Sequence, residues 1–263
     1  MSFAARAIRA RQNALTATSK TQSPHVGSAL SCIDILVFLF EKLTISHENS
    51  RKINKLVFSK GHAAIALYSV LEAYGLISKQ ELESYCIDGS QFYGHVNHLA
   101  HPLVELSTGS LGHGLPFAVG LAHAKKLRNE SGLVFVVMSD GELDEGTTWE
   151  SALLASKFEL DNLVCIVDRN HLQSLSSTES TLPLEPLKEK WEAFGWEVKE
   201  ANGHDFESLT CIDQPMHQPR IVLAKTIKGK GVKWMENDIL WHYRWPSETQ
   251  LLEALDEIQK GAI

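Results

Sequence analysis

Short apolar runs alternate with stretches of helical periodicity along most of the chain. Fully apolar runs at 56–58, 133–138 and 163–167 predict strands that are buried on both faces. Shorter strands are predicted at 196–198 and 221–224. Apolar residues with a helical repeat predict helices at 3–18, 28–43, 62–74, 78–85, 114–128, 146–158 and 185–194, and a last helix from Ser247. Buried strands separated by helices predict an α/β fold, a doubly wound and mainly parallel sheet with helices on both faces.

Local signals mark two helix ends and one long loop. Gly195 follows the helix at 185–194 and suits a left-handed cap. Ser247, with Gln250 three residues on, has the pattern of a capping box. Residues 87–112 are rich in Gly, His, Ser and Pro, and a loop of this length is usually functional or disordered.

Composition and charge narrow the class of protein. The 263 residues carry a net charge of −7 without a long basic or acidic block, which argues against a nucleic-acid-binding surface. The longest apolar stretch, Ile35 to Phe40, is too short to span a membrane. We expect one domain over residues 1–263, with 233–263 as a C-terminal loop and helix. Widely spaced cysteines indicate reduced core or near-core thiols in a cytoplasmic protein: Cys32, Cys86, Cys165 and Cys211.

Polar residues follow two neighbouring buried strands. Asp140 and Gly141 come just after the strand at 133–138, and Asn170 lies just beyond the next strand. Because ligands bind beyond the carboxyl ends of parallel strands, Asp140 and Asn170 are expected at one edge of the sheet. A carboxylate and an amide oxygen make half of a site for a hard cation, Mg²⁺ or alternatively Ca²⁺ or Mn²⁺. A phosphate, water and a backbone carbonyl, for which Leu172 is the candidate, would supply the other ligands.

These residue types also have ordinary interpretations. Asp-Gly after a strand is common turn chemistry, and Asn is common there too. A single histidine is more often a surface or core residue than a catalytic one, although its ring moves protons near neutral pH. A functional cluster is favoured because several histidines share glycine-rich or polar contexts: His25, His62, His95, His113 and His242.

Two sets of motifs resemble known families. The segment from Ser139 to Asn170 resembles the metal–diphosphate motif of thiamine-diphosphate enzymes, which is usually Gly-Asp-Gly followed by Asn about thirty residues on. Ser139 stands in place of the first glycine. The order and spacing of the segments 59–62 and 107–114 resemble transketolase. This resemblance runs from about residue 5 to about residue 245 and implies the thiamine-diphosphate-binding fold of a diphosphate-binding domain.

The resemblance implies roles for individual residues. His62 and His242 would lie near the cofactor diphosphate, and His25 and His95 near the sugar hydroxyls, so that all four line the reaction centre. The metal would be held by Asp140, Asn170 and the carbonyl of Leu172. Glu145 would support the site, and Gly109 and Leu111 would act through their backbone. The full set implied to bind thiamine diphosphate is His62, Gly109, Ser110, Leu111, Asp140, Gly141, Glu142, Glu145, Asn170, Leu172 and His242.

Some positions depart from the transketolase pattern or stay open. Val96 stands where a proline usually follows the third histidine, and His98 and His101 are expected to be surface residues of the loop. A glycine-containing basic loop precedes the fourth histidine and is interpreted equally as solvated or as attracting phosphate. Its lysines are Lys228, Lys230 and Lys233.

Thiamine catalysis also needs a carboxylate that activates the aminopyrimidine. In the family, that Glu and the pyrimidine pocket lie on a second domain of related fold, and this chain ends about where the first domain should end. The resemblance therefore implies the N-terminal subunit of a split transketolase, acting with a separate C-terminal subunit in an α2β2 heterotetramer. Such an enzyme transfers a two-carbon ketol unit from a ketose, here expected to be a sugar phosphate, to an aldose.

Other functions share parts of this pattern. The alpha subunit of a 2-oxo-acid dehydrogenase and a deoxyxylulose-phosphate-synthase-like enzyme share the metal motif, but the segments 60–62 and 109–114 favour transketolase. Two further alternatives stay open. One is a subunit of a specialised pathway that acts on an unusual sugar or keto acid, and the other is a non-catalytic cofactor-binding subunit. No G-x-G-x-x-G follows a predicted strand, which argues against a nicotinamide-dependent dehydrogenase.

Overall fold

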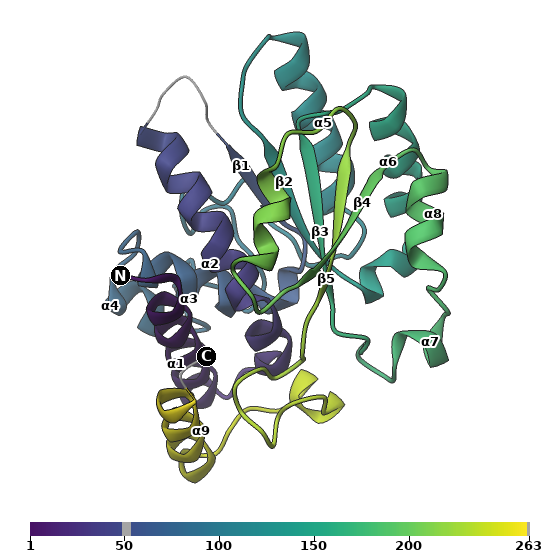
Figure 1. The fold of residues 1–263 in the computed structure, drawn as a ribbon. Coiled ribbons are helices and arrows are strands. Elements are labelled where there is room, and N and C mark those ends of the chain that lie inside the picture. Colours follow the sequence, from purple (N-terminus) through teal and green to yellow (C-terminus); the bar gives the residue numbers. More distant parts are fainter. Residues whose placement is uncertain (49–53, 262–263) are drawn as a thin grey trace.

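A parallel sheet lies at the centre of the molecule (Figure 1). The computed structural model describes residues 1–48 and 54–261. Its five strands pair in the order β1-β2-β3-β5-β4, and every pairing is parallel. The strands are β1 (Lys55–Phe58), β2 (Val134–Ser139), β3 (Leu163–Arg169), β4 (Glu197–Asn202) and β5 (Arg220–Lys225).

Helices cover both faces of the sheet, so the predicted doubly wound α/β architecture is confirmed (Figure 1). One layer contains α1 (Phe3–Thr21), α2 (Val26–Glu48), α3 (Ala64–Ala73) and α9 (Glu248–Lys260). The other contains α5 (Gly114–Leu127), α6 (Gly146–Lys157) and α8 (Leu187–Ala193). The short helices are α4 (Lys79–Glu83) and α7 (Thr178–Thr181), and the 3₁₀ turns are η1 (Gly61–Ala63), η2 (Gly141–Asp144), η3 (Ser208–Asp213) and η4 (Ile239–His242).

Alternate side chains of the central strands belong to opposite hydrophobic cores. In β2, Phe135 and Val137 pack in the core with α1, α2 and α3. Val134, Val136 and Met138 pack in the core with α5, α6 and α8. Because helices cover both faces, the strand is apolar at every one of these positions, and this explains the continuous apolar run in its sequence.

Several elements differ in extent from the sequence-based expectation. β3 continues to Arg169, two residues beyond the expected end, and β4 continues to Asn202 rather than ending at 198. β3 can extend because its polar residue Asp168 is buried against Lys60 instead of facing solvent. The 3₁₀ turns were not expected, since segments of three to six residues are too short to show an apolar repeat.

Both predicted helix-end signals are confirmed. Gly195 follows α8 with a left-handed φ of 82°, a conformation in which glycine avoids the Cβ clash of other residues. The Ser247 side chain accepts from the backbone N–H of Gln250, and the Gln250 side chain accepts from the backbone of Ser247. This capping box fixes the start of α9, which packs against α1.

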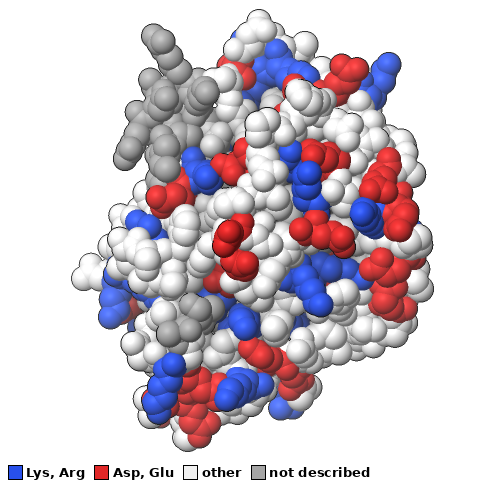
Figure 2. All heavy atoms as spheres, viewed as in Figure 1, with Lys and Arg blue, Asp and Glu red and all other residues white. Residues whose placement is uncertain are grey.

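The surface carries charges of both signs, and the cysteines are unpaired. On the face shown in Figure 2, Lys and Arg side chains are interspersed with Asp and Glu. Across residues 1–48 and 54–261, no helix has the length and apolar character needed to cross a membrane.

The four cysteines are free thiols; Cys32 and Cys165 are buried and Cys211 is partly buried. Cys86 is exposed, in a turn with φ of 55°, so the expectation of a core or near-core thiol is wrong there.

Candidate functional site

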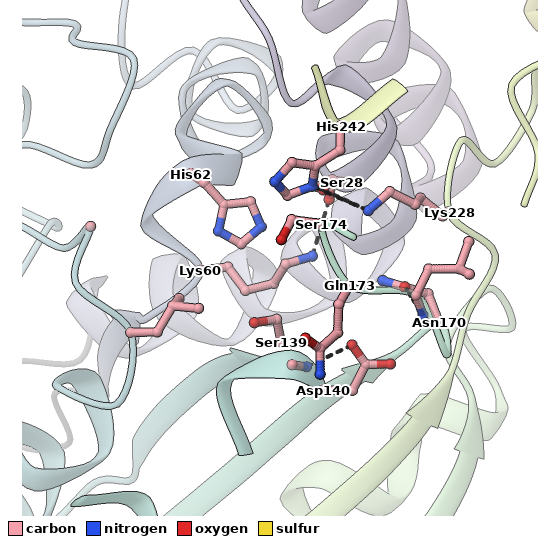
Figure 3. Close-up of a pocket in the computed structure, with 14 residues that line it drawn as sticks. Ser28, Lys60, His62, Ser139, Asp140, Asn170, Gln173, Ser174, Lys228 and His242 are labelled. Carbon is pink, nitrogen blue, oxygen red and sulfur yellow. Dashed lines mark hydrogen bonds between the residues drawn. The ribbon is translucent and has the colours of Figure 1, made fainter. Parts of the chain in front are cut away.

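The carboxyl ends of β2 and β3 form one side of a cavity of about 230 Å³ (Figure 3). Ser139 and Asp168 pair across these strands, which brings the residues that follow, Asp140 and Asn170, to the same edge of the sheet. The start of α2, the loops after β1 and β5, and the turn at 109–112 before α5 supply the rest of the wall. The lining residues are Ser28, Lys60, His62, Gly109, Leu111, Ser139, Asp140, Gly141, Asn170, Leu172, Gln173, Ser174, Lys228 and His242.

Asp140 is a buried carboxylate whose oxygens are oriented by neighbouring donors. Its Oδ1 accepts from the backbone N–H of Gly141 over 2.9 Å, and its Oδ2 accepts from the N–H of His171 over 2.7 Å. Arg169 approaches Oδ2 at 3.4 Å. Burial and the neighbouring carboxylate of Asp168 nevertheless raise the pKa of Asp140 to about 6. The raised pKa means that the neighbouring positive charge does not fully offset burial. A bound cation would therefore stabilise this carboxylate.

The donor set at this edge fits a divalent cation that is shared with a phosphate. Asn170 turns its Oδ1 to the N–H of Leu172 at 3.1 Å, which leaves this oxygen a second lone pair. Leu172 itself lines the cavity. Within the described part of the chain, no group of three His, Cys, Asp or Glu residues could hold a metal. A cation here would therefore need oxygens from a ligand and from water, as Mg²⁺ usually does.

Four histidines from distant parts of the chain meet beside this edge. The ring centroid of His25 lies 4.8 Å from that of His242, 5.4 Å from that of His62 and 5.8 Å from that of His95. The rings of His62 and His242 are 5.5 Å apart. His25 also donates its backbone N–H to the carbonyl of His242 over 3.1 Å, with a left-handed φ of 74°. The fifth candidate, His113, is exposed and bonds to the Leu111 carbonyl at 2.8 Å, outside the cluster.

Burial keeps the inner imidazoles neutral. Burial, His95 and Lys228 lower the pKa of His25 to about 4, and burial and Lys228 lower that of His242 to about 3. Burial and Lys60 lower the pKa of His62 well below its ordinary value. Neutral imidazoles can both donate and accept hydrogen bonds, and they can take up a proton when an anion approaches.

Two lysines lie in the cavity wall. Lys228 is only 2% exposed, so the solvated interpretation of its loop is wrong for this residue. Its Nζ lies 3.2 Å from Ser28 Oγ and 3.4 Å from His242 Nδ1, and points toward the imidazoles in Figure 3. Burial and the nearby charge of Lys60 lower the pKa of Lys228 to about 8. The charge of Lys60 is compensated by an ion pair with the buried carboxylate of Asp168.

The turn at 109–112 lines the cavity through Gly109 and Leu111. An added Cβ on Gly109 would lie 3.3 Å from Cδ2 of His95, so glycine lets this turn pack against the imidazole. Glu142 does not line the cavity. It is fully buried beneath the turn, where it accepts from the N–H of Gly112 over 2.8 Å and from the Ser59 hydroxyl. Glu142 therefore supports the turn, while its role in binding a cofactor stays a prediction.

The remaining residues that the sequence analysis singled out lie either in the cavity wall or outside it. Ser139 and Gly141 lie in the wall, and an added Cβ on Gly141 would be 3.0 Å from Cγ of Gln173. Ser110 and Glu145 are exposed and do not line the cavity. As expected of a surface residue, His98 is exposed and bonds to Ser107.

Sequence reasoning did not single out every residue of the wall. Ser28, Gln173 and Ser174 line the cavity but carry no strong signal of their own in the sequence. Gln173 and Ser174 directly follow the candidate metal ligand Leu172, and this proximity is the clue that could have found them. Arg169, which adjoins Asp140, was also missed, and it is anchored by Glu179 and Glu185.

Comparisons with known proteins relate this chain to transketolases. The chain is 38% identical over 248 residues to one of the subunits of the apulose-4-phosphate transketolase of Phocaeicola vulgatus, a match covering 92% of this chain and 88% of that protein. It is 34% identical over 257 residues to human transketolase, covering 96% of this chain but only 41% of that protein. The solved transketolase of Leishmania mexicana superimposes with a TM-score of 0.89 at 25% identity, over 98% of this chain and 41% of that one.

The chain thus spans about two fifths of the length of the human and Leishmania transketolases, and most of the length of the Phocaeicola protein. Residues 3–243 match the family described as transketolase, thiamine diphosphate binding domain. Because this match covers nearly the whole chain, and relatives more than 30% identical are a transketolase and a transketolase subunit, the protein belongs to the transketolase family through its thiamine diphosphate binding domain.

Proposed function

We propose that this chain is the N-terminal subunit of a split transketolase, which transfers a two-carbon ketol unit from a sugar-phosphate ketose to an aldose. The observation that carries the proposal is the convergence of His25, His62, His95 and His242 beside Asp140 and Asn170. The relative from Phocaeicola vulgatus, a transketolase subunit named for a sugar phosphate, supports both the division into subunits and the substrate class. Residues 1–263 would form one diphosphate-binding domain, with 233–263 as its C-terminal loop and helix.

The cavity offers separate groups for a diphosphate and for its metal. Lys228, Ser28 and the imidazoles of His62 and His242 present donors at one end, where diphosphate oxygens would be bound. Asp140, Asn170 and the Leu172 carbonyl would hold Mg²⁺ at the other end, with phosphate and water oxygens as the remaining ligands. When bound, thiamine diphosphate supplies the thiazolium carbon that attacks the ketose and the ring that accepts the resulting electron pair.

His25 and His95 would act on the sugar. Neither ring lines the cavity that His62 and His242 line, and His95 is exposed. A neutral imidazole can accept a proton from a hydroxyl and return it later, and it can orient a hydroxyl by hydrogen bonding. The low pKa of His25, about 4, keeps this ring in the proton-accepting form before substrate enters.

A second subunit would complete the site. We propose an α2β2 heterotetramer in which the C-terminal subunit supplies the pyrimidine pocket and the activating Glu. Exposed apolar side chains of α5, of α6 and of the residue that follows α6 are available for such contacts: Phe117, Leu153, Leu154 and Phe158. Large exposed apolar patches often mark a protein interface. Free thiols, which persist in a reducing compartment, support a cytoplasmic location.

Calorimetric titration tests this proposal against other chemistry and against a non-catalytic role. The full chain, titrated with thiamine diphosphate in Mg²⁺, should bind it, and omission of Mg²⁺ should weaken binding strongly. With the partner subunit present, ketol transfer between sugar phosphates should follow. Binding without any transfer in the complete assembly would favour the non-catalytic alternative, and transfer to or from a keto acid would favour a specialised pathway.

A further inference from the structure

A buried ion pair lies behind the loop that carries Lys228. Arg11 of α1 donates both terminal nitrogens to the carboxylate of Asp34 on α2, over 2.9 and 2.6 Å. Neither side chain is exposed to solvent, and neither lines the cofactor cavity. Burial opposes the charged carboxylate, but Arg11 and His204 hold the pKa of Asp34 at about 2, below its ordinary value. The carboxylate is therefore a fixed negative charge between two packed helices.

His204 connects this ion pair to the loop. It follows β4, and its Nδ1 lies 2.7 Å from Oδ2 of Asp34, while the backbone N–H of Ile227 donates to its Nε2 over 2.9 Å. Because a backbone N–H group can only donate, Nε2 must present its lone pair. The ring proton is then on Nδ1 and is donated to Asp34. These two bonds fix both the tautomer and the orientation of the ring.

Arg11 holds the other side of the same loop. Its Nε donates to the carbonyl of Lys230 over 3.3 Å. The next residue, Gly231, has a left-handed φ of 97°, and an added Cβ there would lie 3.5 Å from Cδ of Arg11 and 2.7 Å from Cδ1 of Ile258. The loop thus passes close to the arginine. The backbone is held one residue before Lys228 and two residues after it.

The position of the loop matters because a lysine side chain has a long, flexible stem. Lys228 turns inward between the two held points and brings its Nζ to 3.2 Å from Ser28 Oγ. Such a stem places its charge reproducibly only when the backbone beneath it is fixed. We propose that Arg11, Asp34 and His204, here called the clamp, are positioning residues that hold Lys228 for contact with the diphosphate of thiamine diphosphate. The clamp rests on the proposed function, since that function makes a diphosphate the ligand of Lys228.

Two substitutions of His204 separate the contacts of the clamp. The amide of His204→Gln reaches about as far as Nε2, so its oxygen can still accept from Ile227 but cannot bond to Asp34. The amide of His204→Asn reaches about as far as Nδ1, so it can still donate to Asp34 but not accept from Ile227. Each variant loses one bond of the ring. The clamp predicts that His204→Asn, which releases the loop, weakens binding of thiamine diphosphate by about tenfold, as expected for a displaced hydrogen bond to a charged group. His204→Gln keeps the contact with the loop and should weaken binding less.

A double-mutant cycle shows whether this effect passes through Lys228. Calorimetry on the full chain with thiamine diphosphate and Mg²⁺ would compare His204→Asn, Lys228→Ala and the double variant. If His204 acts by positioning Lys228, His204→Asn should cost less than about twofold once Lys228 is alanine. A stabilising role that is unrelated to Lys228 predicts the same loss in both backgrounds.

These experiments distinguish failure of the clamp from failure of the proposed function. Equal losses in His204→Gln and His204→Asn, or an undiminished loss in the Lys228→Ala background, would overturn the clamp while the parent chain still bound the cofactor. Failure of the parent chain to bind the cofactor even with the C-terminal subunit present would contradict the proposed function itself. If His204→Asn does not fold, Arg11→Lys takes its place in the cycle, because lysine can keep one contact to Asp34 but lacks the Nε contact to Lys230. The same non-additivity with Lys228→Ala is then required.

Discussion

The ammonium group of Lys228 lies 3.4 Å from Nδ1 of the His242 imidazole, inside the cavity at the carboxyl edge of the sheet. Lysine and histidine are fourteen positions apart, and the loop between them turns back so that both face the same space. The buried ammonium group keeps the neighbouring imidazole neutral, and such an arrangement favours binding of an anion. Cofactor binding should therefore depend on this lysine more than on any other in its loop.

Removal of the Lys228 charge tests this dependence. Lys228→Ala should weaken binding of thiamine diphosphate by about 10- to 100-fold, the effect of one lost hydrogen bond to a charged group. Lys230→Ala is the matched control, since Lys230 lies in the same loop but outside the cavity wall. Titration calorimetry in Mg²⁺ measures both. Equal affinities of the two variants would remove Lys228 from the diphosphate site.

The pH dependence of binding should report the same lysine. The pKa of Lys228 is lowered to about 8 in the ligand-free chain, and a bound diphosphate should raise it again. Below pH 8 the lysine is charged in both states and affinity changes little. Above pH 8 the free chain must take up a proton to bind, so affinity should fall by up to about tenfold per pH unit. Binding curves between pH 7 and pH 9.5 should show this inflection in the parent chain and in Lys230→Ala but not in Lys228→Gln.

The metal site predicts a graded pair of effects. Asp140→Ala removes a charged ligand and should sharply reduce Mg²⁺-dependent binding of the cofactor, whereas Asn170→Ala removes a neutral ligand and should reduce it more mildly. Glu150→Ala, an exposed acidic residue of α6, serves as the control. Titrations at several Mg²⁺ concentrations distinguish lost metal affinity from lost diphosphate contacts. Parent-like binding by both site variants would show that the assignment is wrong.

The histidine cluster should matter for turnover more than for stability. His62→Ala and His95→Ala should each lower the turnover of the complete assembly by about 10²- to 10⁴-fold, as expected when a positioned proton-transfer or hydrogen-bonding group is lost. His98→Ala, on the same loop as His95 but turned toward Ser107, should leave turnover nearly unchanged. Steady-state assays combined with thermal melts decide the matter. A large fall in melting temperature with little loss of activity would indicate ordinary structural histidines.

The sheet edge could be predicted from the sequence because its signals are local. Continuous apolar runs identified β2 and β3, and parallel strands bring their carboxyl ends to one edge. Asp140 and Asn170 follow these two strands and do meet there. The meeting of His25 with His242 could not be worked out from spacing, because it depends on how loops far apart in the chain fold together. It was expected only from the resemblance to transketolase.

Buried charges were the least predictable feature. Lys228, in a glycine-containing basic loop, looks as solvated as Lys233, and only the tertiary structure shows that Lys228 turns inward while Lys233 is exposed. The ion pair between Lys60 and Asp168 joins residues 108 positions apart. No local sequence pattern predicts such a pair, because each buried charge is stabilised only by its partner in the folded protein. For the same reason the sequence did not indicate that Glu142 is buried beneath the 109–112 turn.

The central claim is that this chain holds the diphosphate-binding half of a two-subunit transketolase. The most direct measurement is ketol transfer between sugar phosphates by the highly purified chain in thiamine diphosphate and Mg²⁺, assayed alone and after addition of a C-terminal subunit that carries the activating Glu. The account predicts no transfer by the chain alone and restored transfer in the mixture, with a higher melting temperature because each subunit stabilises the other by binding. Robust turnover by the chain without any partner would contradict it.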